Sequence, residues 1–563
     1  MLYERPSASA RIASPHQSPP EAKLRRGRAE ILATSVALLA GLGACGGASS
    51  GAHFDESACP FVVDPSQVQG STIRCGILYT PERHESPTQY IQVPVLIFKG
   101  QNPTEPPVIN LSGGPGQSWA DLGLDQITAS ETQSWPMDMV FLEQRGTGLS
   151  RPRLDCPEQG TSESDIDFAI RCGADLQAQG IDATAYNIQE MASDVATFQA
   201  VLGYPAIALD GVSYGTAWGL QILRAYSALV KYAILDSVVN PTIPTLSASA
   251  SATDTALTTT FASCASDSSC SGAYGELESD MANDLTSLSS RPLTLAGSAT
   301  PYDDGSMFGD AVSVLALAPP LLPRMIAAVT AAIASGSGQL LYDSDISAII
   351  GTDTQALSSI AIGQYFSVLC TDNQLVTLAQ VQSDLAKVTP AFSPYLDNSA
   401  LLSICQAWKH QQRTPADYSA VTSAVSTLLV SGALDPLTSP DWARQASTTL
   451  AHGYWVEFPG LGHDVGASTQ TCPEGILSRF SQSPSAPVTS CVQSMTIAFA
   501  APAQPVTVVE NQQVRARLGE QAGPVGLAGS RSLYQRLATQ SRIETLAGRR
   551  HVRQRIAELV KLR

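Results

Sequence analysis

A serine framed by glycines is the residue whose surroundings indicate chemistry most directly. Residues 211–215 read Gly-Val-Ser-Tyr-Gly, between an apolar run that ends at Leu209 and a helix-forming run, Thr216–Leu229. In this context Gly-x-Ser-x-Gly is typical of a nucleophile elbow, whose glycines let strand and helix pack closely. The helix N-terminus then stabilises developing negative charge. We therefore predict that Ser213 is a catalytic nucleophile.

A serine hydroxyl needs a base, and in this arrangement an acid and then a histidine follow the serine along the chain. Residues 458–464 read Phe-Pro-Gly-Leu-Gly-His-Asp, a glycine-rich loop directly after an apolar run. Such a loop lets an imidazole reach the serine, so His463 is the predicted base. The other histidines after the serine are His410, His452 and His551.

The imidazole needs a carboxylate that orients it and stabilises its cation. Asp435 follows the apolar run 428–434 and precedes His463 by 28 residues, which leaves room for one strand–helix unit. Asp435 is therefore the predicted acid, and Asp236 is the alternative. Asp464 is too close in sequence to orient its neighbour easily.

Backbone N–H groups must stabilise the oxyanion that acyl transfer creates. Tyr214, directly after the nucleophile, is predicted to supply one. Residues 112–116, Ser-Gly-Gly-Pro-Gly, follow an apolar run and supply the other. We assign this second donor to Gly114, with Gly113 as the alternative.

Short apolar runs alternate with helical patterns such as Ile188–Leu202. Most of the runs are continuous, as strands buried on both faces of a parallel sheet should be. This alternation predicts a mostly parallel, doubly wound α/β sheet. The expected strands are Ile91–Phe98, Pro107–Leu111, Met137–Leu142, Ala206–Leu209, Tyr232–Leu235, Thr427–Ser431 and Tyr454–Phe458.

The alternation stops between Pro241 and about Pro415, a stretch far longer than the roughly 2–6 residues of an ordinary connection. Helical pieces such as Leu321–Ala334 indicate an inserted helical cap. The predicted organisation is a leader at 1–45, a first core part at 46–240, the cap at 241–415, a second core part at 416–510 and a basic tail at 511–563.

The leader predicts export. A basic patch precedes the uncharged stretch Ile31–Leu42, which is too short to span a bilayer as a helix. Residues 42–45, Leu-Gly-Ala-Cys, resemble a lipobox, so we expect Cys45 to be lipidated and the protein to be a cell-envelope lipoprotein. The alternative is a secreted protein whose signal is cleaved in the ordinary way.

Ten further cysteines fall into five neighbouring pairs, as expected of disulfides in an exported protein. No cysteine or histidine spacing is typical of a metal site, so we expect neither metal nor cofactor. The predicted pairs are Cys59–Cys75, Cys156–Cys172, Cys264–Cys270, Cys370–Cys405 and Cys472–Cys491.

Charge separates the ends from the body. The formal net charge is −17, yet residues 515–563 are rich in arginine. The acidic body argues against nucleic acid as the main partner, because phosphates would be repelled. The tail also carries Leu, Ile and Val at helical spacing, so it is either a solvated extension or a contact to an anionic membrane.

Several motifs together resemble one family over about residues 55–500. Residues 112–116 resemble the His-Gly-Gly-Pro-Gly motif of proline iminopeptidases, with Ser for His. Residues 143–150 resemble their Asp-Gln-Arg-Gly-x-Gly-x-Ser segment, with Glu for Asp. Four further segments resemble the tripeptidyl aminopeptidase branch: residues 211–216, 235–238, 368–372 and about 408–491.

This resemblance implies an α/β-hydrolase fold and a serine exopeptidase that releases short peptides from free N-termini of oligopeptides. Such an enzyme must hold the substrate ammonium group, for which Asp372 is a candidate. Glu143 and Arg145 are expected to brace the loop near the oxyanion hole. Haloalkane and epoxide hydrolases are disfavoured, because they use Asp where Ser213 stands.

Two other functions stay open at this point. A carboxylesterase or amide hydrolase acting on small molecules would use the same three residues. A non-catalytic binding lipoprotein built on a hydrolase scaffold is the second alternative, although an intact Ser, Asp and His set argues against it.

Overall fold

A nine-stranded sheet organises the part of the chain that the structure describes. The computed structural model describes residues 51–156, 163–294, 301–336, 344–350 and 360–502, and near the C-terminus 544–545, 549–551 and 554. The strands lie in the order β1-β2-β3-β5-β4-β6-β7-β8-β9. Their bounds are β1 His53–Glu56, β2 Ile73–Pro81, β3 Tyr90–Phe98, β4 Val108–Leu111, β5 Met139–Leu142, β6 Ile207–Val212, β7 Val230–Asp236, β8 Ser426–Gly432 and β9 Gly453–Phe458.

Strands β5, β4, β6, β7, β8 and β9 are parallel to their neighbours in that order. Strands β1, β2, β3 and β5 pair antiparallel in that order. All seven expected strands are present, so the prediction of a mostly parallel α/β sheet is confirmed. Strands β1 and β2 were not predicted. They lie at the antiparallel edge, where polar residues such as Asp55, Arg74 and Thr80 interrupt the apolar run.

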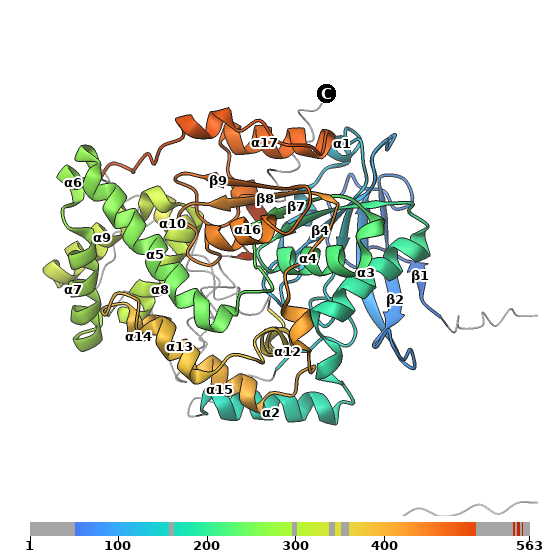
Figure 1. Ribbon diagram of the computed structural model, residues 1–563, viewed down its shortest axis with the longest axis horizontal. Coiled ribbons are helices and arrows are strands. Elements are labelled where there is room, and N and C mark those ends of the chain that lie inside the picture. The colour runs from blue at the N-terminus through green and yellow to red at the C-terminus, as the bar shows by residue number, and fades with distance from the viewer. Residues whose placement is uncertain are drawn as a thin grey trace, which may run out of the picture. The chain divides into compact units, whose positions relative to one another are not determined.

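Helices cover both faces of this sheet (Figure 1). Helices α3 (Ile188–Leu202), α4 (Tyr214–Tyr226) and α16 (Pro440–Ser447) share one apolar cluster with Leu429 of β8. Helix α17 (Thr471–Gln482) shares another cluster with Leu428 of the same strand. Neighbouring residues of β8 thus pack on opposite faces, which explains why this strand is apolar throughout.

The chain between β7 and β8 is helical, and Figure 1 shows α5, α6, α7 and α9 gathered to one side of the sheet. Its first helices have an apolar core of their own, with Phe261, Met281 and Ile326. Helices α12 and α15 instead share a cluster with α2 (Asp165–Ala178). The helices are α5 Thr245–Ser266, α6 Ser268–Tyr274, α7 Leu277–Ser290, α8 Asp304–Leu317, α9 Leu322–Ser335, α10 Ser344–Ile350, α12 Ile362–Asp372, α13 Leu378–Leu385, α14 Ser393–Leu396 and α15 Ser399–Ala407.

Disulfides join the elements at the pairs that the sequence predicts. Five disulfides indicate an oxidising compartment. No described helix is long and apolar enough to cross a membrane. Cys45, the leader and most of the basic tail lie outside the described residues. The bonds are Cys59–Cys75, Cys156–Cys172, Cys264–Cys270, Cys370–Cys405 and Cys472–Cys491.

Candidate functional site

Ser213 stands in the sharp turn between β6 and α4, with a φ of 55°. A side chain on either flanking glycine would collide with backbone. A Cβ at Gly211 would lie 2.7 Å from the carbonyl oxygen of Gly215, and a Cβ at Gly215 would overlap the carbonyl oxygen of Leu111. Positive φ is strained for serine and is held only by such close packing. The glycines of the motif are therefore required by the fit of α4 against β4 and β6.

Asp435 orients the His463 imidazole. The distance from His463 Nδ1 to Asp435 Oδ2 is 2.9 Å, and neither side chain is exposed. Asp435 also accepts hydrogen bonds from the backbone N–H of Leu437 and Thr438 and from the Thr438 hydroxyl, at 2.8, 2.9 and 2.6 Å. A carboxylate on Nδ1 leaves Nε2 available for proton transfer, as a general base requires.

The electrostatics of this pair follow from its burial and its contacts. Burial alone would raise the pKa of Asp435, but the charge of His463 and the hydrogen bonds from His463 and Thr438 hold it below its usual value. Burial alone would lower the pKa of His463, but the charge of Asp435 and their hydrogen bond raise it to about 9, with help from Glu544 and Asp464. The imidazolium form is thus strongly stabilised.

The alternative acids are used elsewhere. Asp236 accepts hydrogen bonds from the backbone N–H groups of Val465 and Gly466, at 2.9 and 2.6 Å, and so braces the loop that carries His463. Asp464 accepts from the N–H of Ala467 at 3.1 Å. Neither carboxylate lies on the imidazole, which is held by Asp435.

The glycine loop at residues 112–116 packs against the nucleophile. A Cβ at Gly113 would lie 3.2 Å from the Cβ of Ser213. Gln144 fixes this loop, because its amide nitrogen donates to the carbonyl oxygens of Ser112 and Gly113, both at 3.0 Å. Its amide oxygen accepts from the N–H of Gly116 at 3.2 Å. The loop that contains the predicted donor Gly114 is thus positioned by one buried side chain.

Glu143 and Arg145, the neighbours of Gln144, were expected to brace the loop near the oxyanion hole, and this prediction is only partly right. Glu143 accepts hydrogen bonds from Thr147 and Ser118 and so supports the segment just after the loop. Arg145 instead forms two hydrogen bonds, each 2.7 Å long, with Asp194 of α3. The glutamine of the motif was the available signal, because a buried amide can both donate and accept.

A residue that sequence reasoning missed, Glu544, contacts the nucleophile. Ser213 Oγ donates to Glu544 Oε1 at 2.7 Å, and the N–H of Gly114 also donates to this carboxylate. His463 Nε2 lies 3.9 Å from the same oxygen and has no hydrogen-bond partner within the described chain. The structure thus brings the predicted nucleophile, base and oxyanion donor around one carboxylate. In this arrangement the serine donates to Glu544 and not to the imidazole.

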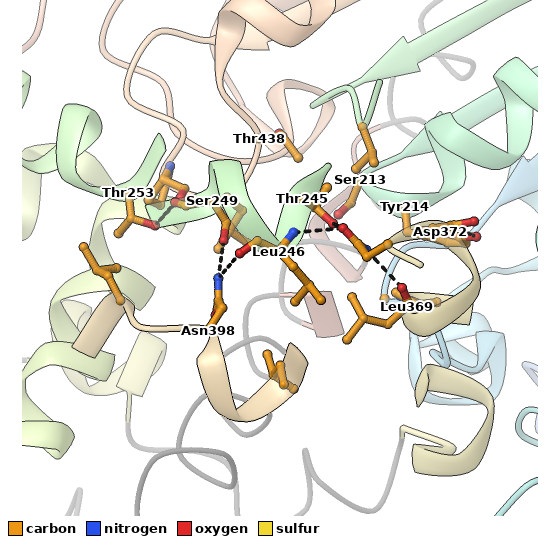
Figure 2. A pocket seen from close by; sticks show the side chains of 18 of the residues that line it. Ser213, Tyr214, Thr245, Leu246, Ser249, Thr253, Leu369, Asp372, Asn398 and Thr438 are labelled. Atoms are coloured by element: carbon orange, nitrogen blue, oxygen red, sulfur yellow. Dashed lines mark hydrogen bonds between the residues drawn. The ribbon is translucent and has the colours of Figure 1, made fainter. Parts of the chain in front are cut away.

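A cavity of about 580 Å³ opens from Ser213 and Tyr214 between the sheet and the helices inserted after β7. In Figure 2, Asp372 lies near Ser213, whereas Asn398 and Thr253 lie toward the other end. The Tyr214 hydroxyl donates to Asp372 at 3.0 Å.

Asp372 also forms an ion pair with Arg413 at 2.7 Å. Burial raises the pKa of Asp372, and Arg413 and Tyr214 offset only part of that rise. Asp372 therefore faces the cavity with its charge already compensated.

Residues 389–492 match the family described as TAP-like protein. They include β8, Asp435, α16, β9, His463 and α17. The chain has an α/β-hydrolase fold, and this part of it matches the TAP-like family. Its sheet order and the turn at Ser213 agree with that assignment.

The solved structures that resemble this chain are distant from it in sequence. An esterase from Exiguobacterium antarcticum is 13% identical over 67% of this chain and 90% of its own, with a TM-score of 0.29. An epoxide hydrolase from Vigna radiata is 14% identical over 70% and 93%, with a TM-score of 0.31. A hydrolase from Pseudomonas aeruginosa is 12% identical over 69% and 91%, with a TM-score of 0.29. No curated protein sequence matches the chain.

Proposed function

We propose that this TAP-like α/β-hydrolase is an exported serine exopeptidase that hydrolyses short peptides from free N-termini through an acyl-enzyme. The observation that carries the proposal is the cavity at Ser213, because its wall includes the carboxylates Asp303 and Asp304 of the inserted helical region. An exopeptidase must hold the substrate terminus at a set distance from the nucleophile, and a carboxylate binds an ammonium group well.

The proposed reaction uses the groups in their observed order. His463 Nε2 takes the proton of Ser213 Oγ, which attacks the peptide carbonyl carbon. The backbone N–H groups of Gly114 and Tyr214 stabilise the oxyanion. The imidazolium, stabilised by Asp435, gives its proton to the leaving amine, and water then hydrolyses the acyl-enzyme by the same route in reverse.

Asp304 is the better placed ammonium ligand, in contrast to the expectation for Asp372. Asp372 is compensated by Arg413, whereas Asp304 accepts a hydrogen bond of 2.8 Å from the Tyr395 hydroxyl and pairs with no described cation. An uncompensated carboxylate gains more from an arriving cation. We assign the ammonium group to Asp304, with Asp303 as its neighbour on the cavity wall.

Export completes the proposal. The disulfides support an extracytoplasmic location, and the leader supports lipidation at Cys45 with attachment to the cell envelope. Mass spectrometry of the membrane fraction tests this part. A mature protein that retains an unmodified Cys45 would remove the lipid anchor and leave a secreted enzyme.

Activity profiling on a peptide library tests the function. Peptides with free amines should be cleaved near their N-termini, and the same peptides with acetylated N-termini should resist. The Ser213→Ala variant is the control for contaminating peptidases. Equal cleavage of free and acetylated peptides would contradict the exopeptidase.

A carboxylesterase acting on small molecules is the second candidate, because apolar side chains also line the cavity, among them Leu246, Phe308 and Val312. Such a lining suits the acyl chain of an ester. Fast turnover of short-chain esters without any peptide turnover would favour this candidate over the exopeptidase.

A further inference from the structure

The C-terminal segment, meaning the described residues 544–545 and 549–551, lies in the site that the proposed reaction needs. We propose that it is an autoinhibitory plug: Glu544 occupies the oxyanion hole, and His551 anchors the segment in an acidic pocket behind the loop of His463. The inference rests on the proposed function, since it takes Ser213 as the nucleophile.

Glu544 fills the position of a reacting carbonyl group. It is hydrogen-bonded to both Ser213 Oγ and the N–H of Gly114. A Cβ at Gly113 would overlap Glu544 Oε2, so the carboxylate lies directly against the glycine loop. This geometry resembles that of the carboxylate product of acyl-enzyme hydrolysis. Because Glu544 is only 2% exposed, a substrate carbonyl cannot share the place.

His551 supplies a second and independent contact. Its Nδ1 lies 2.8 Å from Asp464 Oδ1, and its Nε2 lies 3.6 Å from Asp210 Oδ1. Asp236 belongs to the same buried group. The charge of Arg550, in the same segment, also acts on Asp464. Buried carboxylates are costly without a nearby cation, so a protonated imidazole stabilises this pocket.

Two weaker contacts extend the docked surface. The Gln117 amide nitrogen donates to the Thr545 hydroxyl at 3.4 Å, next to the glycine loop. Arg550 donates to the carbonyl oxygen of Leu317, the last residue of α8, at 3.1 Å. The segment therefore touches both the core and the inserted helical region.

Docking also acts on the base. Burial alone would lower the pKa of His463, and the charge of Glu544 helps Asp435, whose effect is larger, to raise it. An imidazolium cannot accept the serine proton. The plug thus blocks the nucleophile, the oxyanion donor and the base together, and activity requires its release.

Labelling of the full chain with a fluorophosphonate probe tests the plug. We expect Glu544→Ala and His551→Ala to react at least tenfold faster than the wild type. Glu520→Ala, which removes the same charge elsewhere in the tail, should react at the wild-type rate. Equal rates in all four proteins would overturn the plug. Slower labelling of Glu544→Ala would make this carboxylate part of the catalytic machinery and would also overturn it.

A second measurement does not depend on activity. In a Gln117→Cys/Thr545→Cys chain, a short bismaleimide should form an intramolecular cross-link between the two introduced cysteines, located by mass spectrometry in the monomer. A chain with only one of the two substitutions should not form it. Absence of the cross-link overturns the docking whatever the labelling rates are. A cross-link without any labelling at Ser213 contradicts the proposed function and leaves the docking in place.

Discussion

Two carboxylates from different regions approach the two nitrogens of one imidazole. Asp435 follows strand β8 and lies 2.9 Å from Nδ1 of His463, whereas Glu544 comes from the C-terminal segment and lies 3.9 Å from Nε2. Both are almost completely buried. Nevertheless the pKa of Asp435 is lowered, and the pKa of Glu544 is raised to about 7.

Burial is the largest influence on both carboxylates and would raise both pKa values. At Asp435 the charge of His463 and the donors of Thr438 outweigh it. At Glu544 the charge of His463 and the hydroxyl of Ser213 offset only part of it. Asp435 thus keeps its charge, because the turn after its own strand supplies hydrogen-bond donors. Glu544, which comes from the C-terminal segment, can be protonated near neutral pH.

The largest expected effect on turnover comes from substitution of the nucleophile, Ser213. Ser213→Ala should lower kcat on free-amine peptides by about 10⁶-fold, because no other group can form the acyl-enzyme. The melting temperature should stay close to that of the wild type, since the hydroxyl contributes little packing. Substantial remaining turnover by the purified variant would place the nucleophile elsewhere.

Neutralising the two carboxylates should have opposite results. Asp435→Asn should lower kcat by about 10⁴-fold, because an amide cannot stabilise the imidazolium. Glu544→Ala should raise the observed rate, because it removes the side chain that occupies the serine and the oxyanion donor. Steady-state kinetics of both variants decide the assignment. If Asp236→Asn were the variant that lost turnover, Asp236 and not Asp435 would be the catalytic acid.

A smaller effect is expected from the two carboxylates of the cavity wall, Asp304 and Asp372. Asp304→Asn should raise KM for free-amine peptides by about ten- to a hundredfold, as expected for the loss of a charge-assisted hydrogen bond. Ester turnover should not change. Asp372→Asn should mainly lower the melting temperature, because it leaves the buried Arg413 without its partner. The reverse pattern would return the ammonium site to Asp372.

The smallest effect concerns pH. The pKa of Glu544 is raised from 4.5 to about 7 in the docked state, so docking is favoured at low pH and weakens as pH rises through about 7. The ratio of labelling rates, Glu544→Ala over wild type, should fall about tenfold between pH 5 and 8. A ratio that is constant or rises over this range would contradict the shift.

Other groups near the C-terminal segment also titrate, and comparison with the Glu544 variant separates their effect on the labelling rate from that of Glu544. Glu544 faces His463 and Asp464, and His551 faces Asp464, Asp210 and Asp236. Burial and Asp464 raise the pKa of Asp236 to about 7, while the cationic His551 lowers it. Burial alone would lower the pKa of His551, but Asp464 and Asp210 raise it, so the contacts of His551 have a pH dependence of their own. Because Glu544→Ala leaves the contacts of His551 unchanged, the ratio of rates reports Glu544 alone.

Local patterns predicted the positions of the central strands, the turn at Ser213 and the sheet class. Continuous apolar runs, flanking glycines and chain order depend on residues close together in sequence, so they can be recognised without coordinates. The cysteine pairs could also be predicted, because each joins neighbours along the chain. Strands β1 and β2 could not, since their mixed polarity reflects an edge position that only pairing defines.

The sequence by itself determined which residue types could do chemistry and in which order they follow one another. Tertiary packing alone decided that Asp435 and not Asp236 faces His463, that Gln144 fixes the glycine loop, and that Ser213 bonds Glu544, 331 residues away. The physical reason is that a contact between distant segments depends on which buried surfaces and charges fit together. No period or spacing along the chain records that fit.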